Sequence, residues 1–414
     1  MERFSKWTTA MIKQSITKIK DIQRRHEERH TPLQLGFAIG DSIEFLNADH
    51  WDSVALGQSL FLSRRYLHAI ESCVPSNIQL RYALIYDDMR PVAILACQIA
   101  DISGEQFIES SSSGTSSLLL GKVQQRILVC GNLISSGLHG VAFIEGFDPE
   151  LGWRAVAEAL YRIRRADKLN GNIDFAMIKD LKGDQCEQSS ILNRYSYRPI
   201  KTDPDMVLSF NDDCKTHSDY LNLLNSKYRS RIKKTRQSLL DSGFTIERMP
   251  ESEVVSNDAQ LHALYLEVEK RAPVRLATIA SGYFAAMAQA LGDNFRCTAI
   301  KHLANLVGFI VTVKDGDLGI AYYVGIDYAV NEQHPIYLSL LQLSVEDALT
   351  MGCSKISMGR SALEPKANLG AKPVETQVWM RHRISLVNFT LRKFFPIIPY
   401  DEAPERNAFK ELVE

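Results

Sequence analysis

The order of expected secondary-structure elements repeats along this chain, and this repeat restricts the possible folds more than any other feature. In the first half, alternation and turn signals predict strands around one helix, with strands at 80–86, 91–100, 126–132, 141–147 and 173–179 and the helix at 151–167. In the second half they predict strands at 295–302, 306–314, 318–326 and 355–358 and a helix at 335–351. The repeat predicts two α/β units in tandem.

The length of 414 residues supports this division, because a single core stops growing beyond roughly 250–300 residues. We expect an N-terminal unit over 31–210, a C-terminal unit over 211–392 and a tail over 393–414. Residues 1–30 place apolar side chains at three- and four-residue steps among many Lys and Arg, which predicts a basic amphipathic helix. Such a helix docks on its own domain or lies in a membrane interface, and the pattern leaves both open.

The near-zero net charge excludes a protein whose whole surface is positively charged and binds polyanions. Lys and Arg number 48 against 49 Asp and Glu, so DNA is not an expected partner and any phosphate site must be local. Seven scattered cysteines without a CxxC pair indicate a reducing compartment, and no apolar stretch reaches the roughly 20 residues that span a bilayer. We therefore expect a cytoplasmic protein, with any membrane contact at the cytoplasmic face.

The strongest local charge lies at residues 227–236, which hold six cations and no acid. On a helix expected over 218–241, Leu224, Tyr228, Ile232 and Leu239 form an apolar stripe. The cations flank this stripe along two edges, with Lys227, Arg231 and Lys234 on one and Arg229, Lys233 and Arg236 on the other. Such an edge either binds phosphates through charge-assisted hydrogen bonds or is a solvated face, and the pattern leaves both open.

A second candidate site is the loop expected at 359–371, directly after a short strand. It combines glycines with Arg360, Glu364 and Lys366. A carboxylate beside cations can act as a base, and a lysine can hold an anionic or carbonyl oxygen. Spacing alone also fits a solvated loop.

Aromatic residues and one histidine form a third set. Tyr322 and Tyr323 lie on the expected strand 318–326, where alternation sends neighbouring side chains to opposite faces. His334 stands where the chain enters the helix at 335–351, whose N-terminal amides attract anions. We expect no metal site. The sequence has no GxSxG or GxxxxGK[ST] motif, so we also expect no serine nucleophile and no nucleotide site of that class.

Taken together, these segments resemble the GNAT acyltransferase superfamily, and most of all its FemAB-like branch with two GNAT-type domains in tandem. The resemblance rests on the strands at 306–314 and 318–326, the helix after Pro335, and residues 355–360 followed by Lys366 and 369–371. Residues 225–231, which open the basic helix, are also similar to that branch. The implied fold is α/β, with a mixed, mostly antiparallel sheet flanked by helices in each domain, and the C-terminal domain as the active one.

The resemblance implies an N-acyltransferase that moves an acyl group from an acyl-CoA-type thioester or an aminoacyl ester to an amine. Glu364 would then deprotonate or orient the amine, and Lys366 would hold the carbonyl or a donor phosphate. Tyr323, with Tyr322 as second choice, would protonate the leaving group. The expected donor- and phosphate-binding residues are Lys227, Arg229, Arg231, Lys234, His334 and Arg360.

The sequence departs from the family in one loop. Acyl-CoA enzymes of this family usually carry an Arg/Gln-x-x-Gly-x-Gly/Ala loop before the helix at 335–351, but residues 327–335 contain no glycine. The expected co-substrate is acyl-CoA, with no tightly bound cofactor, and aminoacyl-tRNA is the other donor considered. The alternative function is a non-catalytic GNAT-like module that binds a phosphorylated ligand or a protein partner.

Overall fold

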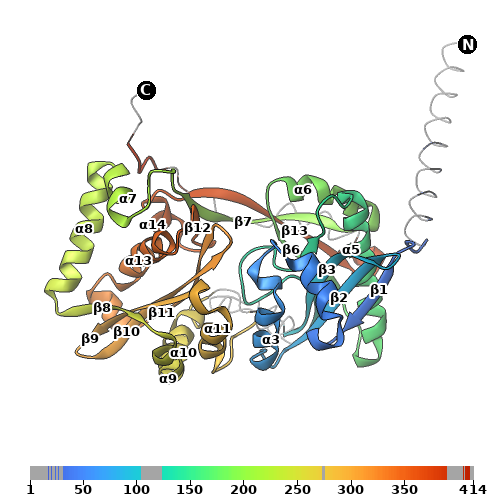
Figure 1. The fold of residues 1–414 in the computed structure, drawn as a ribbon, viewed down its shortest axis with the longest axis horizontal. Helices are drawn as coiled ribbons and strands as arrows, with labels where there is room; N and C mark the ends of the chain where they lie inside the picture. The colour runs from blue at the N-terminus through green and yellow to red at the C-terminus, as the bar shows by residue number, and fades with distance from the viewer. Residues whose placement is uncertain are drawn as a thin grey trace, which may run out of the picture.

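The computed structural model describes residues 31–103, 124–272, 276–388 and 406–410, together with five isolated positions. The strands form one continuous sheet with the order β1-β2-β3-β4-β6-β13-β7-β12-β11-β10-β9-β8, and β5 pairs with β3. Figure 1 shows the two halves of the chain side by side along this sheet. The helix expected over residues 1–30 falls outside the described residues except at four positions.

The first half carries its longest helix, with a short one beside it, on one face of the sheet and two further short helices on the other. Its strands are β1 (Gly36–Gly40), β2 (Ile78–Asp87), β3 (Arg90–Ser103), β4 (Gln124–Cys130), β5 (Val141–Phe143), β6 (Phe175–Leu181) and β7 (Arg198–Ser209). The helices are α2 (Ala48–Ala55), α3 (Arg64–Ser72), α5 (Pro149–Ala166) and α6 (Asp184–Gln188). Trp153 and Leu160 of α5 pack into one core with β3, while Trp51 and Tyr66 fill a core on the opposite face.

The second half follows the same plan. Its strands are β8 (Phe244–Met249), β9 (Phe295–His302), β10 (Asn305–Asp315), β11 (Leu318–Ile326), β12 (Lys355–Ser357) and β13 (Lys372–His382). Its helices are α7 (His217–Leu223), α8 (Ser226–Asp241), α9 (Glu251–Ser256), α10 (Asp258–Glu269), α11 (Tyr283–Leu291), α12 (Tyr328–Gln333), α13 (Ile336–Thr350) and α14 (Leu363–Ala367). Parallel pairing joins β4 to β6 around α5 and β11 to β12 around α13, which confirms the expected repeat of two mixed, mostly antiparallel units.

The last strand of each half lies beside the other half. β7 pairs with β12 of the second half, and β13 pairs with β6 of the first half as well as with β7. Figure 1 shows β7 and β13 running between the halves. Hydrogen bonds of the sheet therefore cross the division at residue 210, so we propose it as the boundary between the two repeats along the chain and not between separately packed domains.

The helix expected over 218–241 is two helices, so that prediction was wrong at its start. Leu224 and Asn225 are extended between α7 and α8. The amide of Asn225 donates to the Ala408 carbonyl at 2.8 Å, and its side chain donates to the Phe409 carbonyl at 2.9 Å. The C-terminal segment thus forms hydrogen bonds with backbone groups near Asn225 that would otherwise pair within a continuous helix. In the described part of the chain, no helix combines the length and apolarity that crossing a bilayer requires.

Candidate functional site

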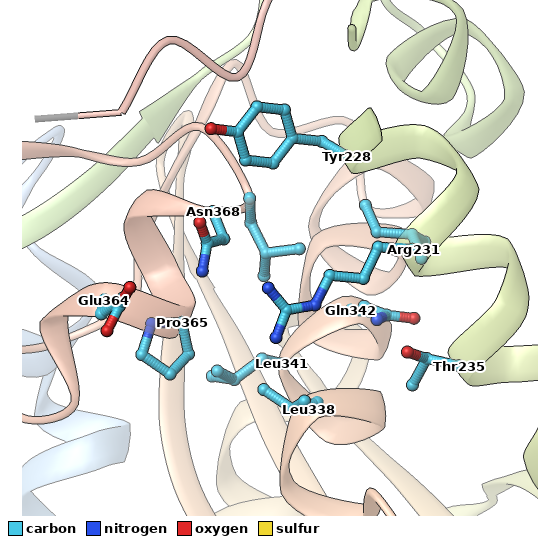
Figure 2. Close-up of a pocket in the computed structure, with 11 residues that line it drawn as sticks. Tyr228, Arg231, Thr235, Leu338, Leu341, Gln342, Glu364, Pro365 and Asn368 are labelled. Atoms are coloured by element: carbon cyan, nitrogen blue, oxygen red, sulfur yellow. The ribbon is translucent and has the colours of Figure 1, made fainter. Parts of the chain in front are cut away.

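A cavity of about 200 Å³ lies between α8, α13 and α14. α13 precedes β12 in the chain and α14 follows it. β12 pairs with β11 over three residues and ends at Ser357. In Figure 2 the guanidinium of Arg231 extends from α8 into this space, with Glu364 on the α14 side. The lining residues are Tyr228, Arg231, Ile232, Thr235, Leu338, Leu341, Gln342, Glu364, Pro365, Asn368 and Leu369.

The cavity joins residues from the basic helix and from the loop after β12, which were separate candidates in the sequence. Arg231 is exposed, whereas Ile232 below it is only 4% exposed and anchors α8. Glu364 lies in the first turn of α14, a helix that forms within the segment expected to be a loop. Its carboxylate accepts a hydrogen bond from Arg406 at 3.0 Å, so the C-terminal segment reaches the rim of the same cavity.

Lys366 lies on the inner side of α14 and is 3% exposed. The Nζ atom of Lys366 lies close to Gly359, 3.8 Å from the position that a Cβ atom would take there. The ammonium is therefore beside the backbone that follows β12. Burial lowers the pKa of Lys366 to about 8, and the negative charge of Asp205 offsets part of this effect. A lysine in such a place carries a charge at neutral pH that water screens little.

Two buried carboxylates from the first half fix this backbone. Asp205 of β7 accepts hydrogen bonds from the Ser357 hydroxyl at 2.7 Å and from the Gly359 amide at 3.1 Å. Asp180 of β6 is fully buried and forms an ion pair with Arg360. The expected phosphate ligand Arg360 is thus engaged with a carboxylate. Sequence reasoning missed both acids, although an acid inside an apolar strand such as 175–181 is a recognisable signal.

The expectation that Tyr322 and Tyr323 face opposite sides of the sheet was wrong. Val311 pairs with Tyr323 and Thr312 with Ala321, so Tyr322 is the extra residue of a β-bulge. Both rings therefore lie in one core, with centroids 4.8 Å apart.

Both hydroxyls have partners at the junction of the halves. That of Tyr322 lies 3.2 Å from the hydroxyl of Tyr66 and contacts that of Tyr283. That of Tyr323 donates to the Ile134 carbonyl at 2.5 Å. Burial raises the pKa of Tyr322 and Tyr323 well above the usual range, so both stay protonated. To protonate a leaving group, the Tyr323 hydroxyl would first have to break its hydrogen bond to the Ile134 carbonyl.

The other expected donor ligands do not line the cavity. Lys227 and Lys234 are exposed and Arg229 half-buried on α8, while His334 packs its ring 4.8 Å from that of Phe244. The segment 227–236 is also partly compensated, because Arg236 donates to Glu346 of α13 at 2.7 Å. Among the residues that the structure describes, no three His, Cys, Asp or Glu side chains gather as metal ligands.

Comparison with known proteins agrees with this geometry. Residues 226–367 match the family described as the acetyltransferase (GNAT) domain, and no curated protein matches the chain. The structure of FemX aligns with a TM-score of 0.54 at 10% identity, over 84% of this chain and 98% of FemX. A tandem GNAT protein from the clavulanic acid biosynthesis pathway aligns with a TM-score of 0.50 at 11% identity, over the same shares. These two structures show the fold alone.

The matched span holds α8, α13, α14 and the cavity, so this part of the chain is similar to an acetyltransferase (GNAT) domain. The fold of the whole chain is similar to that of FemX and of the tandem GNAT protein, with two units of the same plan along one sheet.

Proposed function

We propose that this chain transfers an acyl group from an acyl-CoA-type thioester or an aminoacyl ester to an amine, with the donor held in the cavity between α8, α13 and α14. The observation that supports this most is that the cavity joins Arg231 and Glu364 inside the GNAT-matching span. In this reaction the amine nitrogen forms a bond to the acyl carbon, and the bond from that carbon to sulfur or oxygen breaks. The amine loses a proton and the leaving group gains one.

The residues divide these tasks. Glu364 takes the amine proton, and Lys366, which lies beside the cavity lining on the same helix, stabilises the oxyanion of the tetrahedral adduct. Tyr323 stays proposed as the proton donor to the leaving group, although its ring lies in the core on the other face of the sheet from the cavity. Residues 328–333, which would carry a glycine loop in acyl-CoA enzymes, form α12. Side chains must therefore take over the binding of donor phosphates, and Arg231 is the α8 cation that reaches the cavity. Lys227, Arg229, Lys234 and His334 remain proposed as secondary contacts.

Donor binding tests this assignment. We expect Arg231→Gln to weaken binding of acetyl-CoA or of a non-hydrolysable aminoacyl-tRNA about tenfold, because a charge-assisted hydrogen bond to phosphate is lost. Lys233→Gln, at an exposed cation of the same helix that is outside the cavity lining and has no proposed role in binding, serves as the matched control and should bind as well as the wild type. Isothermal titration measures both. If neither donor binds the wild type, or if both variants bind alike, the donor site is wrongly placed.

Replacing Glu364 tests the proposed base. Glu364→Gln keeps the shape but removes the proton acceptor, so we expect kcat to fall by at least about tenfold with little change in donor affinity. Glu375→Gln on β13, whose carboxylate is 84% exposed and pairs with Lys201, is the control. Steady-state kinetics with a small amine acceptor gives the comparison. A wild-type kcat in the Glu364 variant would remove this residue from the mechanism.

Peripheral membrane contact through residues 1–30 at the cytoplasmic face is also part of the proposal, and a large amine such as an amino lipid would suit it. The amphipathic pattern of these residues motivates it. Sedimentation with vesicles, using the chain with and without residues 1–30, tests it, and equal sedimentation of both would exclude this contact.

A further inference from the structure

A second group of cations lies in the first half, away from the cavity beside α8. Arg164, Arg165 and Lys168 come from the C-terminal end of α5 and the turn after it, and Arg381 and Arg383 come from the end of β13. We call these five residues the arginine patch. They line two adjoining hollows that share Tyr161, Arg164 and Arg383, and the larger hollow has a volume of about 310 Å³.

The protein compensates little of this charge. Among the described residues, Asp174 is the one acid that lines the two hollows, and it accepts a hydrogen bond from Arg383 at 2.8 Å. The other guanidinium groups lie near aromatic rings, with Arg164 5.5 Å and Arg165 5.9 Å from the centre of Tyr161. Burial, Arg381 and Arg383 lower the pKa of Arg164. The like charges therefore disfavour one another while no ligand is bound.

Such a group of guanidiniums around a concave surface has the chemistry of a phosphate site. Guanidinium groups donate paired hydrogen bonds to phosphate oxygens, and several together balance more than one negative charge. We propose that the arginine patch binds the phosphate group of a ligand, at a site separate from the donor cavity. The hollow suits a compact phosphate group better than a long, flat polyanion, because its cations face a space of about 310 Å³.

Two sources share this chemistry, a free phosphate compound and an anionic lipid headgroup. The lipid source is favoured by where the basic N-terminal segment joins the fold. The amide of Leu33 donates to Glu158 of α5 at 2.8 Å, and Arg162 stacks over Phe37 at 4.4 Å. The chain that directly follows the basic residues 1–30 therefore contacts α5, the helix that carries the patch. The proposal concerns binding only and does not depend on the acyl transfer.

A charge-matched pair of variants tests the patch. Arg165→Gln/Lys168→Gln removes two exposed cations from it, and Arg90→Gln/Lys372→Gln removes two exposed cations elsewhere. We expect the first variant to bind inorganic pyrophosphate, or vesicles of phosphatidylglycerol and phosphatidylcholine, at least about tenfold more weakly than the wild type. The second variant should bind as the wild type does. Circular dichroism confirms that both variants fold.

The two probes distinguish the sources. Saturable binding of pyrophosphate in titration indicates a soluble ligand. Binding that requires phosphatidylglycerol in the vesicle indicates a lipid headgroup. Either result supports the site if Arg165→Gln/Lys168→Gln loses that binding. Equal binding by both variants, or no binding of either probe to the wild type, would overturn the proposal. So would a preference for an RNA duplex over both probes. Acyl transfer to a small amine should stay unchanged in the patch variant, which separates this site from the donor cavity.

Discussion

Lys366→Met should lower kcat at pH 7 by about a hundredfold without unfolding the protein. Lys366 is 3% exposed, and its ammonium lies beside the backbone after β12, where it is the proposed partner of the developing oxyanion. Loss of one such donor in a dry site typically costs about 10²–10³ in rate. Methionine fills a similar volume without a charge, so the fold should tolerate it. Lys355→Met on β12, at a side chain that is 43% exposed, is the control and should retain wild-type kcat.

The pH profile tells how Lys366 acts. Its pKa is lowered to about 8, so the ammonium is charged below pH 8 and becomes neutral above it. A lysine that stabilises an oxyanion therefore predicts a fall in wild-type kcat as the pH rises through 8, and this fall should be missing in Lys366→Met. A rise with the same midpoint would mean that the neutral amine acts as a base. That result, or equal rates in the two proteins, would contradict the assigned role.

The sequence predicts most of the second half because local patterns decide it. The strands expected at 295–302 and 318–326 coincide with β9 and β11, and the helix expected at 335–351 differs from α13 by one residue at each end. Alternating apolar residues, glycines at turns and three- and four-residue spacing specify these elements without distant partners. The tandem α/β plan follows from the same signals.

The sequence did not predict that β7 and β13 pair with strands of the other half, and the reason is physical. β7 contains Pro199 and Pro204, which argue against a central strand when only the local pattern is considered. Its neighbours are β12 and β13, which lie more than 140 residues further along the chain. Contacts between the halves stabilise this pairing, and the local sequence pattern of a strand does not indicate such contacts.

The details of the site depend on equally distant contacts. The bulge that brings Tyr322 and Tyr323 to one face arises from the register between β10 and β11. The break before α8 arises from the C-terminal segment at Asn225. Arg231 and Glu364 were each named from the sequence, but their shared cavity follows from the packing of α8 against α13 and α14. Residue types were therefore predictable, while their grouping required the fold.

The largest effect on stability is expected from Asp180→Ala. Asp180 is fully buried, accepts the Gly137 amide at 2.9 Å and a hydrogen bond from Lys179 at 2.5 Å, and pairs with Arg360. Removing one partner of a buried ion pair leaves uncompensated charge and costs about 3–5 kcal/mol. Urea unfolding measures this loss, and Asp213→Ala at an exposed acid is the control. A loss below about 1 kcal/mol would show that Asp180 does not join the halves.

The sign of the pH dependence sharpens this test. The lysine and arginine beside Asp180 lower its pKa to about 2, below the value of roughly 3.9 expected in the unfolded chain. The contribution of Asp180 is therefore complete above pH 4 and is lost as the pH falls through 2. The difference in unfolding free energy between the wild type and Asp180→Ala should shrink over this range. Asp180→Asn keeps a hydrogen-bond acceptor for the Gly137 amide but carries no charge. Its unfolding free energy should therefore lie between those of the wild type and Asp180→Ala, and residue 180 should contribute no pH dependence in this variant.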